Sequence, residues 1–205
     1  MDAEISEGLF APYLDTLRLK YQRHIPVRDA RNIDFRIEGS PPILCDVKEV
    51  RPGEDESKGI DAFAHIREDL SELRKKFGPS DPETPVLLVT VNFSGTMFTG
   101  FSVARAMLGD VGAEFSAEGR GKFHHLRRGN ASMTRSHHTL ISGIFAFDCE
   151  ATGNHALFLN PYSARSLPDA WFPAVNRVAV AKDASEARLR ELANMTFWHC
   201  DEHAP

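Results

Sequence analysis

Two short runs of hydrophobic and polar residues near the beginning of the chain predict a β-hairpin. The runs cover residues 33–37 and 43–50, and the glycine- and proline-rich segment between them is typical of a chain reversal. Antiparallel pairing about a turn near Ser40 places Asp34 opposite Asp46. The hairpin therefore brings two carboxylates to mirror positions.

Two carboxylates opposed in this way favour a bound cation. Side chains alternate between the faces of a strand, so Lys48 shares a face with Asp46, whereas Val47 points to the other face. Opposed carboxylates destabilise a sheet unless they share a proton or a cation, and their oxygens suit Mg²⁺ or Mn²⁺. The pattern predicts a metal site at Asp34 and Asp46. The alternative is an edge hairpin with an ordinary solvated face.

The hydrophobic pattern of the remaining chain predicts alternating helices and strands. Apolar positions spaced by three and four predict helices over residues 3–21 and 61–77, and a near-continuous apolar run predicts a buried strand over residues 85–93. Pro12 means that the first helix either kinks or begins there. A strand over residues 21–27 completes the order helix, three strands, helix, strand. Later in the chain, residues 101–108 predict a short helix, and residues 139–147 predict either a buried strand or the end of a helix. Residues 156–159 predict a short strand, and residues 185–195 predict a last helix.

The hairpin also resembles a known family. Asp34 followed by Asp46-Val47-Lys48 looks like the core of the PD-(D/E)XK nuclease superfamily, which has the restriction-endonuclease-like fold. The resemblance implies that Asp34 and Asp46 bind Mg²⁺, that Val47 offers its carbonyl, and that Lys48 orients or activates the attacking water. The sequence lacks the proline that commonly precedes the first Asp, and this proline is often missing in the family. The matching residues lie in the first half of the chain.

The same resemblance implies roles for residues on the two predicted helices that flank the hairpin region. Relatives usually supply a further Glu from the first helix, and Glu7 is the best match, with Glu4 one turn earlier as the alternative. An acidic first turn is equally typical of a solvated helix start. Arg67 and Lys76 fall near positions where relatives place basic or glutamine residues that face the scissile phosphate, although charge on an amphipathic helix is commonly its solvated face.

The predicted fold is α/β, with a central mixed β-sheet flanked by helices in the αβββαβ order of a restriction-endonuclease-like core. A length of 205 residues suits one domain. Within residues 1–205, we expect residues 1–95 to form the nuclease-like core. Residues 96–205 would be an elaboration that completes the sheet and carries a basic segment.

The basic segment extends from Gly119 to Phe147, which contains no acidic residue although the chain has a net charge of −5. This overall charge excludes a general nucleic-acid coat protein, whereas a nuclease needs only a local basic surface. The alternative is a basic loop that balances acidic neighbours. Phosphate contacts would use its basic side chains, Arg120, Lys122, Arg127, Arg128 and Arg135.

Composition and cysteine usage indicate a globular protein of the cytoplasm. Hydrophobic residues make up 42% and charged residues 26% of the chain, no apolar run reaches membrane-spanning length, and the acidic start is unlike a signal peptide. Cys45, Cys149 and Cys200 are too widely spaced to predict a disulfide framework. His199, Cys200 and His203 lack a second ligand pair, so we expect no zinc site there.

Together these patterns predict a metal-dependent endonuclease that hydrolyses DNA phosphodiester bonds with Mg²⁺ or Mn²⁺. The alternative is a catalytically inactive member of the same fold that acts as a nucleic-acid-binding or protein-binding module. An unrelated small-molecule enzyme ranks last, because the sequence has no P-loop, dinucleotide fingerprint or nucleophile elbow. The sequence leaves open whether the substrate is DNA or RNA and whether the protein forms a homodimer.

Overall fold

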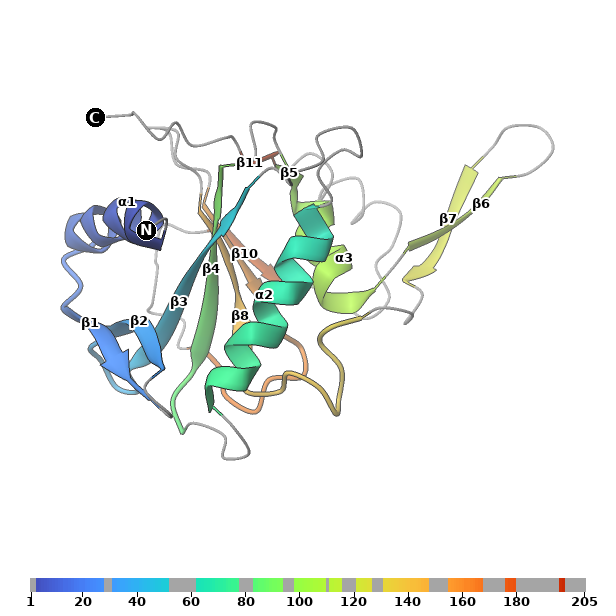
Figure 1. The fold of residues 1–205 in the computed structure, drawn as a ribbon. Helices are drawn as coiled ribbons and strands as arrows, with labels where there is room; N and C mark the ends of the chain where they lie inside the picture. Colours follow the sequence, from blue (N-terminus) through green and yellow to red (C-terminus); the bar gives the residue numbers. More distant parts are fainter. Residues whose placement is uncertain are drawn as a thin grey trace.

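The computed structural model has a mixed β-sheet at its centre, with helices on both faces (Figure 1). The structure describes residues 3–27, 31–51, 62–77, 83–93, 98–109, 111–115, 121–126, 131–147, 155–167, 176–179 and 196–197. Within these residues the helices are α1 (Ala3–Thr16), α2 (Ala62–Phe77) and α3 (Gly100–Leu108). The α/β class and the mixed sheet predicted from the sequence are confirmed.

The central sheet has seven strands within the described residues. In spatial order they are β1 (Tyr21–Pro26), β2 (Asn32–Ile37), β3 (Ile43–Val50), β4 (Val86–Asn92), β8 (Ile141–Phe147), β9 (Ala156–Leu159) and β10 (Asn176–Ala179). β2 is antiparallel to both of its neighbours, β1 and β3. The strands β3, β4 and β8 are parallel, β9 is antiparallel to β8, and β10 is parallel to β9. The order of α1 to β4 along the chain is the predicted one.

Two small sheets lie outside the central one. β5 (Phe98–Thr99) pairs with β11 (Thr196–Phe197), and β6 (Val111–Phe115) pairs with β7 (Gly121–Leu126). The β6–β7 hairpin extends away from the central sheet (Figure 1). The predicted last helix, residues 185–195, lies outside the described residues. For residues 139–147 the structure decides between the two alternatives, because β8 is a fully buried strand.

The predicted register of the hairpin is confirmed. β2 and β3 pair through Phe35 and Cys45, Arg36 and Leu44, and Ile37 and Ile43, which is the register of a turn centred on Ser40. The same register places Asp34 opposite Asp46, one position beyond the last of these pairs.

Helix α1 covers one face of the sheet. Phe10 and Leu14 are fully buried against the hairpin, where they pack in one apolar cluster with Phe35 and Val47. Val47 and Phe35 therefore point to the face opposite Asp46, as the alternation of strand side chains predicts. Pro12 lies inside α1 on its exposed side, so the helix does not begin at that proline.

Helices α2 and α3 cover the other face. Ile66, Leu70 and Leu73 on α2 are fully buried, and they belong to the same apolar cluster as Leu44 on β3 and Leu88 on β4. Their spacing of three and four puts them on one side of the helix, as the sequence pattern predicts. The central strand β4 is buried on both faces for this reason.

The predicted extent of the first helix, residues 3–21, is wrong. α1 ends at Thr16 because the backbone turns into the left-handed region at Arg18, with φ of 55°. The N–H of Leu19 then donates to the carbonyl of Leu14 at 3.0 Å and closes the end of the helix. Glycine is the usual residue at such a position, and Arg18 gives no comparable signal in the sequence.

None of the helices in the described parts of the chain is both long and apolar enough to span a membrane.

Two glycines give a matched test of the packing. A Cβ added at Gly143 on β8 would lie 2.5 Å from the carbonyl oxygen of Phe158, so Gly143→Ala forces two backbones apart. We expect this variant to lower the free energy of unfolding by about 1–3 kcal/mol. Gly8→Ala is the control, because no atom lies within 4 Å of an added Cβ on α1.

The Gly8→Ala variant should be as stable as the native protein or more stable by up to about 1 kcal/mol, since alanine favours the helix. Urea denaturation of both variants measures the two effects. A Gly143→Ala protein as stable as Gly8→Ala would contradict the packing of β8 against β9.

Candidate functional site

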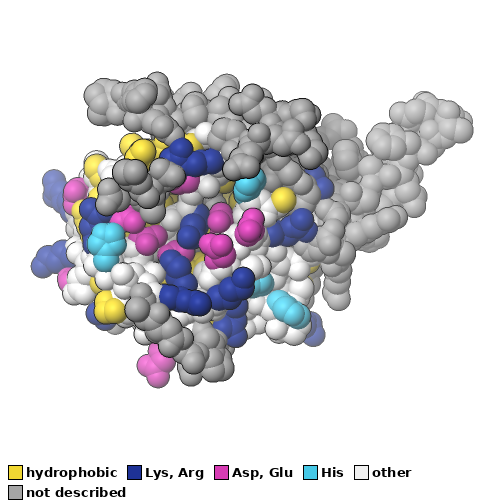
Figure 2. All heavy atoms as spheres, in the orientation of Figure 1, with side chains coloured by type: hydrophobic (Ala, Val, Ile, Leu, Met, Phe, Trp, Pro, Cys, Tyr) yellow, Lys and Arg dark blue, Asp and Glu magenta, His cyan; other side chains and the backbone are white. Residues whose placement is uncertain are grey.

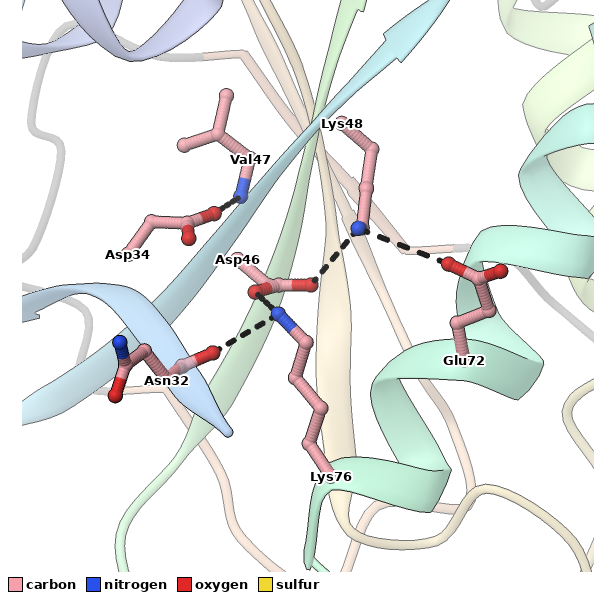
Figure 3. Close-up of polar contacts among 7 residues, drawn as sticks. All are labelled: Asn32, Asp34, Asp46, Val47, Lys48, Glu72 and Lys76. Carbon is pink, nitrogen blue, oxygen red and sulfur yellow. Dashed lines mark hydrogen bonds and ion pairs between the residues drawn. The ribbon is translucent and has the colours of Figure 1, made fainter. Parts of the chain in front are cut away.

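The candidate site lies where β2 and β3 stop pairing. Their backbone ladder ends at Phe35 and Cys45, and the next N–H of β3 on this edge, that of Val47, donates to Oδ2 of Asp34 at 2.7 Å (Figure 3). A carboxylate thus takes the place of a backbone carbonyl. In an extended strand the N–H and C=O of one residue point to the same side, so the Val47 carbonyl also points toward the Asp34 side.

Asp46 is the most enclosed residue of the site. Its side chain is fully buried on the α2 face of β3, and Oδ1 forms a close ion pair with Nζ of Lys76. The other oxygen, Oδ2, lies 3.9 Å from Nζ of Lys48 and has no hydrogen-bond partner among the described residues. A buried carboxylate oxygen without a hydrogen bond is costly unless a cation is near. The sequence analysis predicted both the carboxylate and its neighbour Lys48.

Burial raises the pKa of both central carboxyl groups. The pKa of Asp46 rises to about 6, first because of burial and then because of the negative charge of Asp34, while Lys76 and Lys48 act in the opposite direction. The pKa of Asp34 is also raised by burial and by Glu7, against the Val47 hydrogen bond and Lys76. The effect of Asp34 on the pKa of Asp46 agrees with the mirror positions of the two carboxylates in the hairpin register.

Lys48 connects the hairpin to helix α2. Its Nζ lies 3.7 Å from Oε2 of Glu72 as well as 3.9 Å from Asp46, and its side chain keeps 26% of its surface exposed. Burial lowers the pKa of Lys48, but the carboxylates of Asp46, Asp69 and Glu72 outweigh this effect, and the net pKa is raised. Lys48 therefore carries a positive charge in direct contact with solvent at the site.

Helix α2 contributes a polar stripe that faces β3. Asp69, Glu72 and Lys76 follow each other at spacings of three and four, so they lie on one side of the helix. The Nζ of Lys76 also donates to the carbonyl oxygen of Asn32 at 3.0 Å (Figure 3). The resemblance pointed to Lys76, whereas Asp69 and Glu72 were missed, because charged residues on an amphipathic helix give no signal of which strand they face.

Glu7 is buried, with 3% of its surface exposed, and it is paired with two basic side chains of β1. Its Oε2 lies 2.8 Å from Nη2 of Arg23 and 3.7 Å from Nε2 of His24. The charge of Glu7 raises the pKa of Asp34, so Glu7 lies near the site. Among the described contacts, Glu7 forms no ion pair with the lysines of the site. The side chain of Glu4, the alternative, lies outside what the structure describes.

A carboxylate on β3 positions the helix that carries Glu7. Glu49 is on the α1 face of the strand, and its Oε1 accepts a hydrogen bond from the N–H of Ser6 at 3.1 Å. Its Oε2 pairs with Nε of Arg51 at 2.6 Å. A negative charge near the first turns of a helix is favourable, so this contact holds α1 against the strand that bears Asp46 and Lys48.

The residues fit a magnesium ion in part. Within the described segments, no three His, Cys, Asp or Glu side chains are placed to hold a metal ion. Asp34, Asp46 and the Val47 carbonyl nevertheless supply oxygen donors, and Asp46 has a buried oxygen without a hydrogen bond. Mg²⁺ commonly binds through one or two carboxylates and takes its remaining ligands from water and substrate phosphate. Oxygen donors of this type are those that Mg²⁺ and Mn²⁺ prefer.

Charged side chains gather on the face that carries α2. Figure 2 shows Asp and Glu side chains near the centre of this face, with Lys and Arg side chains around them. Of the predicted phosphate-binding residues, Arg135 is exposed in the loop before β8, and Lys122 lies on β7, whose side chains are not described. Three lie outside the described residues, Arg120, Arg127 and Arg128. Residues 198–203 also lie outside the described residues. The predicted phosphate contacts and the expectation of no zinc site therefore stay predictions.

Comparisons with family models, curated proteins and solved structures find no match to this chain. The support for a function therefore comes from the geometry of the site.

The half-buried carboxyl group of Asp69 makes the stability of the protein depend on pH. Burial raises its pKa from 3.8 to about 7, so the folded state holds the proton more tightly than the unfolded state does. The resulting stabilisation is complete below the ordinary pKa and is lost as the pH rises through 7. At about pH 8 we expect Asp69→Asn to melt at a higher temperature than the native protein. The difference should be about 2–4 °C for each kcal/mol by which the variant is more stable.

The difference in melting temperature should narrow as the pH falls toward about 4, where Asp69 is neutral in both states. Glu68→Gln is the control, because this neighbour is exposed on the same helix and its loss removes the same charge. Thermal unfolding followed by circular dichroism measures all three proteins. An Asp69→Asn variant that is less stable than the Glu68→Gln control at high pH would show that ionised Asp69 stabilises the fold.

Proposed function

We propose that the protein is a metal-dependent endonuclease that hydrolyses DNA phosphodiester bonds with Mg²⁺ or Mn²⁺. The observation that carries the proposal is the placement of two carboxylates, Asp34 and Asp46, beside the ammonium of Lys48 at the end of the β2–β3 ladder. The order of α1 to β4 supports it, because helix, three strands, helix, strand is the order of a restriction-endonuclease-like core. In this proposal the central sheet is that core.

Asp34, Asp46 and the Val47 carbonyl would hold the ion. When bound, Mg²⁺ or Mn²⁺ would polarise the phosphate and lower the pKa of a water molecule. The hydrogen bond from Val47 fixes Asp34 in place, and burial fixes Asp46, so the oxygen donors are preorganised. Glu7 on α1 would add a third carboxylate near the ion. Because Glu7 pairs with Arg23, it would act through its charge and not as a direct ligand.

Lys48 would position the attacking water or stabilise the charge that develops on the phosphate. In the hydrolysis, the water gives up a proton as its oxygen forms a bond to phosphorus. The bond from phosphorus to one sugar oxygen breaks, and this oxygen takes up a proton from solvent, so that water is divided between the two products. Lys48 is suited to its role because Asp46 and Glu72 hold its ammonium while part of its surface stays exposed to the substrate side.

The substrate would bind through its phosphates. The basic segment around Arg135, together with Arg120, Lys122, Arg127 and Arg128, would contact the backbone of DNA, and a homodimer would allow both strands to be cut. The free, buried thiol of Cys45 fits a protein of the reducing cytoplasm.

A second function is favoured by one contact. The ammonium of Lys76 already pairs with Asp46, which is where the metal would bind. If this lysine replaces the ion permanently, the protein would be an inactive member of the same fold that binds nucleic acid or another protein. Metal binding and cleavage separate the two functions.

Cleavage of defined substrates tests the proposed reaction. We expect the native protein to cut labelled DNA only when Mg²⁺ or Mn²⁺ is present, and the rate of Asp46→Asn to fall by about 100-fold or more, because transition-state stabilisation of several kcal/mol is lost. Duplex DNA, single-stranded DNA and RNA of one sequence serve as parallel substrates. Glu38→Gln is the control, since it removes one exposed carboxylate away from the site.

Circular dichroism and thermal unfolding show whether each variant keeps its fold. A folded Asp46→Asn protein that cuts as fast as Glu38→Gln would refute the assignment of Asp46. A native protein that binds the oligonucleotides but neither binds Mn²⁺ nor cuts them would favour the binding module.

A further inference from the structure

Lys76 is placed as a cation inside the acidic site. Its side chain extends from the last turn of α2, keeps only 17% of its surface exposed, and ends between β2 and β3. Its Nζ donates both to Oδ1 of Asp46 and to the carbonyl oxygen of Asn32, at 3.0 Å from the latter (Figure 3). The ammonium therefore has a carboxylate and a main-chain carbonyl as its partners, which are the ligand types that Mg²⁺ takes.

The carboxylates need this charge when no metal is bound. Asp34 and Asp46 are neighbours of like charge; Asp46 is fully buried and Asp34 is half-buried. Repulsion between them is strong in such surroundings, so an ammonium beside Asp46 stabilises the ionised pair. The Nζ of Lys48 lies 3.9 Å from the other oxygen of Asp46, Oδ2, and Lys48 also forms an ion pair with Glu72. Lys76 is thus the closer of the two lysines to Asp46.

A metal ion bound at Oδ1 of Asp46 and this ammonium cannot share one position. Mg²⁺ binds carboxylate oxygens at about 2.1 Å, and two cations on one side of Asp46 would repel each other. The lysine can leave, because its four-carbon stem is flexible and it is attached near the end of the helix. Asp34 cannot make room in the same way, since the Val47 N–H holds it.

We infer that Lys76 is a tethered cation that occupies the metal position and is displaced when Mg²⁺ or Mn²⁺ binds. The inference rests on the proposed function, because it concerns the same metal site. It makes Lys76 a regulator of metal loading: the ammonium competes with the ion for Asp46, keeps the site neutralised without metal, and weakens the apparent affinity for metal.

Direct measurement of Mn²⁺ binding tests this inference. Calorimetry and the electron paramagnetic resonance signal of free Mn²⁺ give the dissociation constants of the native protein, Lys76→Gln and Lys75→Gln. We expect Lys76→Gln to bind Mn²⁺ about fivefold more tightly or better, which corresponds to the loss of an ion pair of about 1 kcal/mol. Lys75→Gln removes the same charge from the exposed neighbouring position and should bind as the native protein does.

Lys76→Met keeps the apolar stem and gives a second variant with the same expected result, and circular dichroism shows which variants are folded. Equal or weaker Mn²⁺ binding by the folded Lys76 variants would overturn the inference while leaving the metal-dependent nuclease intact. Binding by the variants but not by the native protein would support the inference and count against activity of the native chain. Absence of binding in every protein, also when a non-cleavable DNA duplex is present, would overturn both.

Discussion

The site depends on a carboxylate that takes the place of a backbone hydrogen-bond acceptor. Beyond Phe35 and Cys45 the two strands of the hairpin no longer pair, and Asp34 accepts the N–H of Val47 at 2.7 Å. An unpaired N–H inside a sheet would be costly, so the side chain restores the hydrogen bond that the backbone gives up. Because a side chain replaces the backbone acceptor, this part of β3 is not paired with the backbone of β2, and charged oxygens lie beside it.

Charged side chains reach this unpaired part of β3 from both faces of the sheet. Helix α2 supplies Lys76, Glu72 and Asp69 from one face, and α1 brings Glu7 from the other. The hydrophobic packing of both helices therefore also sets the electrostatics of the site. Removing a charged group from water is expensive, and the alternation of carboxylates and lysines is what allows Asp46 to be fully buried.

The same alternation explains why we consider two functions for one site. Carboxylate oxygens that hold a lysine also suit a divalent ion, because both cations are attracted by the same charges. Lys48 is shared between Asp46 and Glu72, whereas Lys76 is bound closely to Asp46 and to a main-chain carbonyl. Under our proposal, the relative strength of lysine binding and metal binding at Asp46 would decide between a nuclease and a binding module.

The sequence by itself determined the hairpin, its register and the meeting of Asp34 with Asp46. These features depend on local signals, since a proline-rich turn and a strand period of two leave little choice of pairing. The buried strand over residues 85–93 and the apolar side of the helix over residues 61–77 were predictable for the same reason. The end of the first helix was not, because Arg18 adopts a conformation that usually requires glycine.

Only the tertiary structure decided which charges surround the two carboxylates. Lys76 lies 30 residues after Asp46, and its contact arises from the packing of α2 on the sheet. Glu7 reaches β1 through the placement of α1, to which Glu49 contributes a hydrogen bond. Long, flexible side chains on an amphipathic helix are compatible with many partners, so spacing along the chain cannot specify the one they take. The partner is set by distance in space, which the fold alone provides.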